Sequence, residues 1–235
     1  MSSTDTVPNQ LPLNVRLRDD ATLDNFLCNN GHETAIAAIK GQLAETGEPV
    51  VYLYGAADTG KSHLLQAACH EAGNGALYLP LDELAEYSPA DVLQGMEHLK
   101  LVCLDDIDAV LGQEQWEHAL FHFYNRAREE GCRILVAGAA APRVLDVKLP
   151  DLQSRLSWSV VFQLGLYDDE IRQEILVFRA ARRGLSMPPE VANYIITRAP
   201  RGLSALLNLL EQLDNASLIE QRSLSIPFVK SQFAW

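Results

Sequence analysis

The chain has 235 residues, of which 48% are hydrophobic and 21% are charged, so it can bury the core of one or two domains and wholesale disorder is excluded. Its net charge of −12 repels a DNA backbone, so we expect protein partners and little direct DNA binding. No apolar run or signal core suits a bilayer, which predicts no membrane association and a cytoplasmic location. We expect the four cysteines to be buried free thiols.

Residues 1–20 are expected to form a flexible tail, because Met1 to Asn9 is mostly polar and has no periodicity. A short, partly apolar segment, Gln10 to Val15, follows within this tail. Apolar residues then recur at helical spacing from Glu33 to Ala44, which predicts a first helix.

Short apolar runs then alternate with helical patterns, which predicts a parallel sheet covered by helices on both faces. The predicted strands are residues 50–54, 76–79, 101–104, 133–137 and 160–164, with helices over 61–72 and 116–130. After Leu166 the strands stop, and helices are predicted over 168–183, 189–198, 203–218 and 227–230. We therefore expect an α/β domain, 21–166, followed by a small all-helical domain, 167–235.

A complete phosphate-binding motif follows the first predicted strand. The residues that fit G-x-x-x-x-G-K-[ST] are Gly55, Ala56, Ala57, Asp58, Thr59, Gly60, Lys61 and Ser62. Backbone N–H groups of such a loop point at phosphate oxygens, Lys61 neutralises the outer phosphates, and the Ser62 hydroxyl ligates Mg²⁺. We place the next helical residue, His63, in the nucleotide-binding set as a packing residue. The alternative, a chance glycine-rich turn, does not account for the strand before the loop and the helix after it.

Two acids end the third predicted strand, where open α/β sheets bind their ligands. Asp105 is expected to hold Mg²⁺, directly or through water, and Asp106 to orient the attacking water. The alternative is that both acids cap the following turn.

These residues resemble those of the AAA+ ATPases, and more narrowly of the bacterial replication initiator DnaA. The resemblance rests on Leu23 to Leu27, on Gly60 to Leu65 and on Leu104 to Ile107, and it extends over about residues 22–230. It implies a P-loop AAA+ core with a five-stranded parallel sheet, a small helical lid domain, and ADP or ATP with Mg²⁺ as ligands. Which base the pocket prefers stays open.

Three further stretches resemble Hda, a family of DnaA-related regulators that inactivate the initiator. They are Gln10 to Leu13, Met96 to Cys103 and Ser225 to Lys230. The first is similar to a peptide that binds the DNA polymerase sliding clamp, which implies partner contacts by Gln10, Leu11 and Leu13; a random tail is the alternative. The resemblance also implies DnaA as a partner. Whether nucleotide stabilises a monomer or a homodimer stays open.

Arginines at three positions matter to this resemblance. Leu152 to Leu156 is similar to the segment that carries the AAA+ arginine finger, so Arg155 is expected to reach a neighbour's nucleotide, where such a finger can contribute ~10³–10⁵ in rate. The helix from Leu203 resembles the sensor-2 helix, whose nearest arginine is Arg201; Arg172 is a second candidate for a nucleotide contact. Ala139 to Ala141 lack the polar side chains expected of sensor 1, which predicts weak intrinsic hydrolysis.

Three functions compete. The first is a negative regulator of replication initiation that binds the DNA-loaded clamp and stimulates hydrolysis of DnaA-bound ATP through Arg155. The second is a self-contained AAA+ ATPase acting as a helicase loader or chaperone, with turnover resting on Lys61, Asp105 and Asp106. The third is a small-molecule P-loop kinase, which the helical region after Leu166 disfavours. We expect the first.

Overall fold

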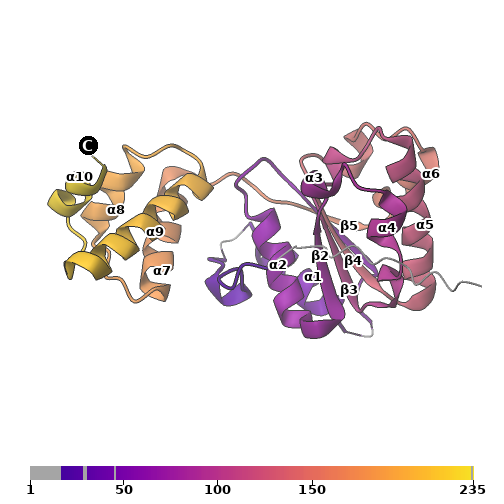
Figure 1. Ribbon diagram of the computed structural model, residues 1–235, viewed down its shortest axis with the longest axis horizontal. Coiled ribbons are helices and arrows are strands. Elements are labelled where there is room, and N and C mark those ends of the chain that lie inside the picture. The colour runs from indigo at the N-terminus through magenta and orange to yellow at the C-terminus, as the bar shows by residue number, and fades with distance from the viewer. Residues whose placement is uncertain (1–16, 29–30, 45, 234) are drawn as a thin grey trace, which may run out of the picture.

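The computed structural model describes residues 17–28, 31–44, 46–233 and 235. Of the predicted flexible tail, 1–20, the first 16 residues lie outside these described residues, and with them Gln10, Leu11 and Leu13. An α/β domain and a cluster of helices lie side by side and are joined by an extended connection after the last strand (Figure 1).

The sheet has five parallel strands in the order β2-β3-β4-β1-β5. These strands are β1 (Val50–Tyr54), β2 (Ala76–Pro80), β3 (Leu101–Asp105), β4 (Arg133–Gly138) and β5 (Val160–Gln163). Because all strands run in the same direction, the carboxyl ends of β1, β3 and β4 meet at one edge of the sheet. This order brings the P-loop after β1 and the acids at the end of β3 to the same edge, separated by β4.

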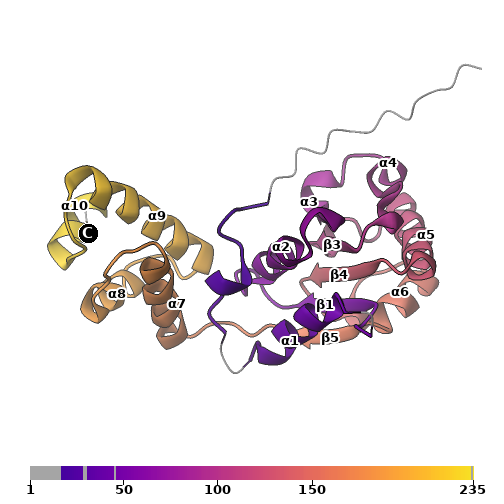
Figure 2. The ribbon, with the colours of Figure 1, turned by 90° about the horizontal axis from the view of Figure 1, so that it is seen from below.

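Helices cover both faces of the sheet (Figure 2). One face packs α1 (Glu33–Gln42) and α2 (Lys61–Ala72) against Val51 and Leu53 of β1. Tyr52, between them on β1, points to the other face and its separate apolar cluster. The helices of that face are α3 (Leu81–Leu84), α4 (Pro89–Leu93), α5 (Glu114–Glu130) and α6 (Pro150–Ser157). Near-continuous burial of β1, β3 and β4 follows from this double cover.

The helices after the connection have an apolar core of their own. They are α7 (Asp169–Arg182), α8 (Pro189–Ile196), α9 (Leu203–Glu220) and α10 (Ile226–Phe233). Buried Leu206, Leu210 and Leu213 recur along α9 at helical spacing and face this core. We call this helical unit the lid. Within the described part of the chain, no helix combines the length and the apolar character needed to cross a membrane.

The predicted fold class is confirmed, since the sheet is five-stranded and parallel and a helical unit follows it. The short helices α3, α4 and α6 were not predicted, because so few turns give almost no periodicity to read. The fifth predicted strand forms as β5, which lies at the sheet edge and alternates between half-buried and exposed residues. Burial holds for three cysteines and is wrong for Cys28, which is exposed.

Candidate nucleotide site

The P-loop connects β1 to α2 and is stabilised by hydrogen bonds within the loop. Lys61 Nζ donates to the carbonyl oxygens of Gly55, at 2.8 Å, and Ala56, at 2.9 Å. The hydroxyl of buried Thr59 also donates to Ala56 O, at 2.9 Å. Gly60 has φ +90°, and a Cβ there would lie 2.8 Å from Phe26 Cε2, so only glycine fits without displacement. Lys61 is therefore folded back onto the carbonyl groups of its own loop, and the close approach of the loop to Phe26 depends on a glycine at position 60.

The two acids at the end of β3 have different surroundings. Asp105 is almost fully buried, and its carboxylate accepts from Tyr78 Oη at 2.7 Å and from the backbone N–H of Asp106 at 3.1 Å. Burial raises the pKa of Asp106 to about 6; the carboxylates of Asp105, Asp82 and Asp108 contribute to the rise, and Lys61 opposes it. Asp105 is thus held in place by two hydrogen-bond donors, whereas Asp106 faces the cavity beside Lys61.

These residues fit a magnesium–nucleotide ligand. The crowding of carboxylates that raises the pKa of Asp106 is what a divalent cation would relieve. Of the two residues predicted to hold the ion, Ser62 lines the cavity, whereas Asp105 is buried and is not among the lining residues. No group of three or more acids, histidines or cysteines in residues 17–28, 31–44, 46–233 and 235 could hold a metal ion. Phosphate oxygens would therefore have to complete the coordination, as is usual for Mg²⁺.

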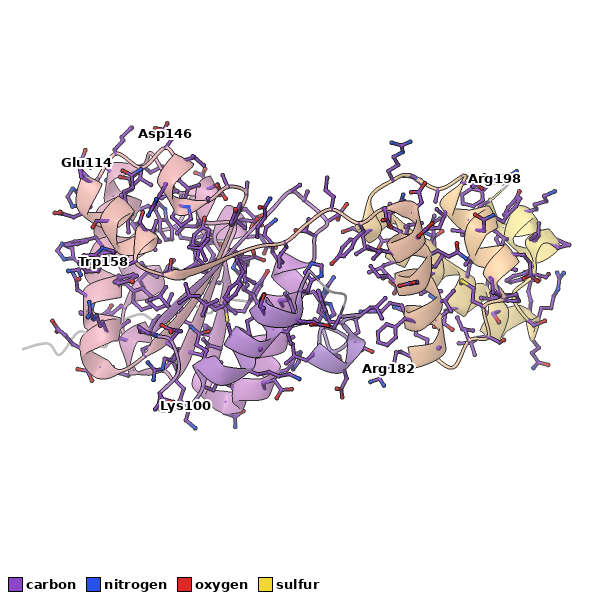
Figure 3. All side chains as sticks on the ribbon, turned by 180° about the vertical axis from the view of Figure 1, so that it is seen from behind. Lys100, Glu114, Asp146, Trp158, Arg182 and Arg198 are labelled. Carbon is purple, nitrogen blue, oxygen red and sulfur yellow. The ribbon has the colours of Figure 1, made fainter. Side chains whose placement is uncertain are left out.

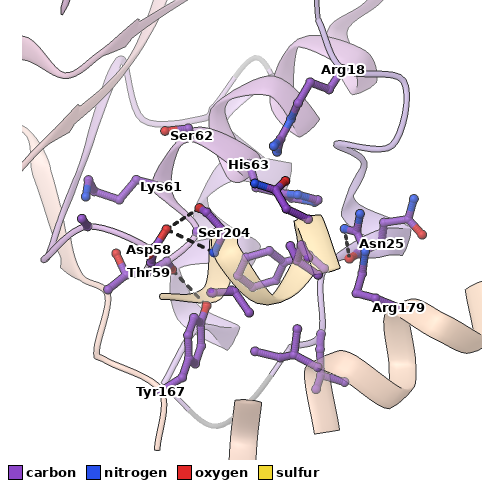
Figure 4. A pocket seen from close by; sticks show the side chains of 18 of the residues that line it. Arg18, Asn25, Asp58, Thr59, Lys61, Ser62, His63, Tyr167, Arg179 and Ser204 are labelled. Carbon is purple, nitrogen blue, oxygen red and sulfur yellow. Dashed lines mark hydrogen bonds between the residues drawn. The ribbon is translucent and has the colours of Figure 1, made fainter. Parts of the chain in front are cut away.

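A cavity of about 300 Å³ lies over the P-loop, between the α/β domain and the lid (Figure 4). On one side, the carboxylate of Asp58 in the P-loop accepts from the backbone N–H of Ser204, at 3.3 Å, and from its hydroxyl. Asp58 has φ +63°, and a Cβ on Gly202 would lie 2.5 Å from its Oδ2, so the approach depends on that glycine. Asp58 thereby caps the start of α9, which has no side-chain cap of its own.

On the other side, an N-terminal segment, residues 18–27, forms the wall of the cavity. His63 Nε2 donates to Thr22 O at 2.8 Å, and burial lowers the pKa of this imidazole to about 4, so it is neutral. Arg179 of α7 is buried, forms an ion pair with Asp20 and donates to Asn25 O at 3.1 Å. The segment is therefore attached to both α2 and the lid.

Several predicted residues line this cavity, and sequence reasoning missed others. The predicted members are Ala57, Asp58, Thr59, Gly60, Lys61, Ser62, His63 and Asp106. Those not predicted as nucleotide contacts include Arg18, Tyr167 and Arg179. Arg201 is exposed and does not line the cavity, while Arg172 is buried and donates to Asp169 and Pro200. The sequence signal for Arg179 was weak: it is one of several arginines spaced along the predicted helix 168–183.

Arg155 lies elsewhere. It is half-buried on α6, which lies on the side of the α/β domain away from the lid (Figure 1). Its guanidinium carbon is 4.8 Å from the centre of the Trp158 ring. Arg155 is not among the residues that line the cavity, so the two predicted functional centres are separate.

The backbone after β4 is held without polar side chains. Ala139 N–H donates to Asp108 Oδ2 at 2.6 Å, and Tyr52 Oη donates to Ala140 O at 3.1 Å. Asp108 and Tyr52 thus hold the backbone of this loop. The alanine methyl groups offer no hydrogen-bond donor to a phosphate or a water molecule.

Comparisons with known proteins agree with this geometry. Residues 51–164 match the family described as ATPases associated with various cellular activities, and residues 169–233 match the lid domain of Hda. Domain III of the Thermotoga maritima initiation protein DnaA is similar, with a TM-score of 0.77 and 21% identity over 94% of this chain and 98% of that one. AMPPCP-bound DnaA from Aquifex aeolicus is similar with a TM-score of 0.71 and 26% identity, over 87% of this chain and 68% of that one. The Thermotoga maritima RuvB Holliday junction branch migration motor has a TM-score of 0.67 and 15% identity, over 91% of this chain and 71% of that one.

Proposed function

Since the chain belongs to the AAA+ proteins related to DnaA and carries an Hda-type lid, we propose that it is a negative regulator of replication initiation. It binds ADP or ATP with Mg²⁺ in the cavity over the P-loop. It presents Arg155 to the ATP held by DnaA and stimulates hydrolysis of that ATP. Gln10, Leu11 and Leu13 tether it to the sliding clamp on DNA.

The separation of the two centres is the observation that carries this proposal. The cavity faces the lid, whereas α6, the helix that carries Arg155, lies on the side of the α/β domain away from the lid. A guanidinium in that position cannot serve the nucleotide of its own chain, and it suits a nucleotide presented by a neighbour. Positive charge brought to the γ-phosphate in this way stabilises the transition state of phosphoryl transfer.

The chain's own site favours holding a nucleotide over turning it over. From the lid, the only guanidinium lining the described cavity is Arg179, which is already paired with Asp20. Ser204 occupies the start of α9 and contacts the P-loop carboxylate, where its hydroxyl supplies no positive charge. The alanines after β4 add no polar side chain. A triphosphate would thus meet few groups that stabilise the transition state.

A self-contained ATPase, acting as a helicase loader or chaperone, is the second candidate. Asp105 and Asp106 favour it, because the first is fixed by Tyr78 and the second faces the cavity beside Lys61. Steady turnover of ATP by the isolated chain that is lost in Asp106→Asn would support this candidate.

The deciding experiment follows hydrolysis of DnaA-bound ATP in the presence of clamp loaded on DNA. The chain should accelerate hydrolysis, and Arg155→Ala should abolish most of the acceleration. Arg128→Ala is the matched control. Arg128 is an exposed arginine on α5, and its charge and that of Arg155 both act on the Tyr124 hydroxyl, so the two arginines lie in the same region. Loss of either one changes the net charge equally. No acceleration by the wild-type chain, with clamp and nucleotide binding intact, would refute the regulatory function. Loss of clamp retention in Gln10→Ala tests the tether separately.

A further inference from the structure

A large aromatic side chain lies on the surface directly beside the proposed finger. Trp158 follows the last residue of α6 and is 64% exposed, which is unusual for so large an apolar group (Figure 3). It comes one helical turn after Arg155, and its backbone N–H donates to Arg155 O at 3.2 Å. The end of α6 thus fixes the backbone of Trp158 relative to that of Arg155. At 4.8 Å from the ring centre, the guanidinium is within range of a cation–π contact.

The partner of Arg155 distinguishes it from most arginines of the described chain. Arginines within 4.0 Å of a carboxylate are Arg18, Arg126, Arg172, Arg179, Arg182, Arg183 and Arg222. In the described ranges Arg155 makes no such ion pair. A carboxylate would compete with phosphate for the N–H donors of the guanidinium. An aromatic face holds the cation while leaving those in-plane donors available.

We propose that Trp158 is a positioning residue, which holds the Arg155 guanidinium in the orientation that contacts the partner's nucleotide. This inference rests on the proposed function of Arg155. A long arginine side chain loses rotamer freedom when it docks, and a guanidinium already stacked on a fixed ring loses less. Because the finger acts on charge that develops at the γ-phosphate in the transition state, this saving lowers the barrier to hydrolysis in the assembled complex more than it strengthens assembly.

The test measures single-turnover hydrolysis of DnaA-bound ATP on clamp-loaded DNA while the full chain is titrated. The titration separates the rate at saturation from the concentration giving half of that rate. Trp158→Leu keeps much of the apolar area without a ring and should lower the saturating rate about threefold to tenfold. Trp158→Phe restores an aromatic face and should recover part of the loss. Leu218→Ala, at a lid side chain that is 70% exposed, is the control and should match wild type.

A double variant shows whether Trp158 acts through the arginine. If it does, Arg155→Ala with Trp158→Leu should be no slower than Arg155→Ala alone. A further loss in the double variant would overturn the inference, as would a changed half-saturating concentration with an unchanged saturating rate. Equal saturating rates for wild type and Trp158→Leu would overturn this inference and leave the proposed function standing. A wild-type chain that does not accelerate hydrolysis would refute the proposed function, and the inference with it.

Discussion

A single methyl group added at Gly60 should both destabilise the chain and disrupt the P-loop. At φ +90° an L-residue costs about 1–2 kcal/mol. The new Cβ would also lie 2.8 Å from Phe26 Cε2 and 3.3 Å from Tyr167 Oη. The Phe26 ring is held between the rings of His32 and His63, so moving it adds about 1–3 kcal/mol of overpacking. We expect Gly60→Ala to lower the free energy of unfolding by about 2–5 kcal/mol.

Gly95 provides a matched control for the backbone contribution. It has φ +77°, and a Cβ there would meet nothing within 4 Å, so Gly95→Ala should cost only the backbone share of about 1–2 kcal/mol. Urea unfolding gives both values, and titration with a fluorescent ADP analogue should show weaker binding for Gly60→Ala alone. Equal destabilisation of the two variants would show that the loop does not depend on its contact with Phe26.

Three other changes test the groups around the cavity. Without divalent cations, the raised pKa of Asp106 means that the folded chain binds this proton more tightly than the unfolded chain, so the free energy of unfolding should fall as pH rises from about 4 to about 6. The fall should amount to about 1 kcal/mol after solvent screening. Asp106→Asn should remove it, which urea titrations across this pH range would measure. Ser204→Ala should cost about 1 kcal/mol and speed hydrogen exchange in the first turn of α9, whereas Ser217→Ala, on the same helix, should leave that turn unchanged. Asp20→Asn should cost about 1–3 kcal/mol in thermal unfolding, because buried Arg179 loses its carboxylate; an unchanged melting temperature would contradict the ion pair.

The sheet and the P-loop could be predicted because their signals are local. Each buried strand is a short apolar run, and the glycines, Lys61 and Ser62 are contiguous in the chain. The parallel sheet then follows from the helices between the strands. Exposure along β5 could not be predicted, because an edge strand shares its apolar composition with a central one.

The wall and roof of the cavity were beyond sequence reasoning. Asp20 and Arg179 meet across 159 positions, and Asp58 and Ser204 meet across 146, so no local pattern connects either pair. Arg201 was the nearest arginine to the start of α9, yet it precedes the helix and is exposed. By contrast, the spacing of Arg155 and Trp158 was visible in the sequence, and only the stacking distance gave it meaning.

The lid is attached to the rest of the molecule at two places besides its covalent connection. Figure 4 shows Ser204 and Arg179 on opposite sides of the pocket, the first bonded to the P-loop and the second to the N-terminal segment. Both contacts border the cavity, so we expect a nucleotide bound there to be released faster when either attachment breaks. The two differ in kind, because the ion pair of Arg179 with Asp20 weakens in salt more than the cap on α9. Rising ionic strength should therefore open the pocket from the side of the N-terminal segment and shorten the residence time of the nucleotide.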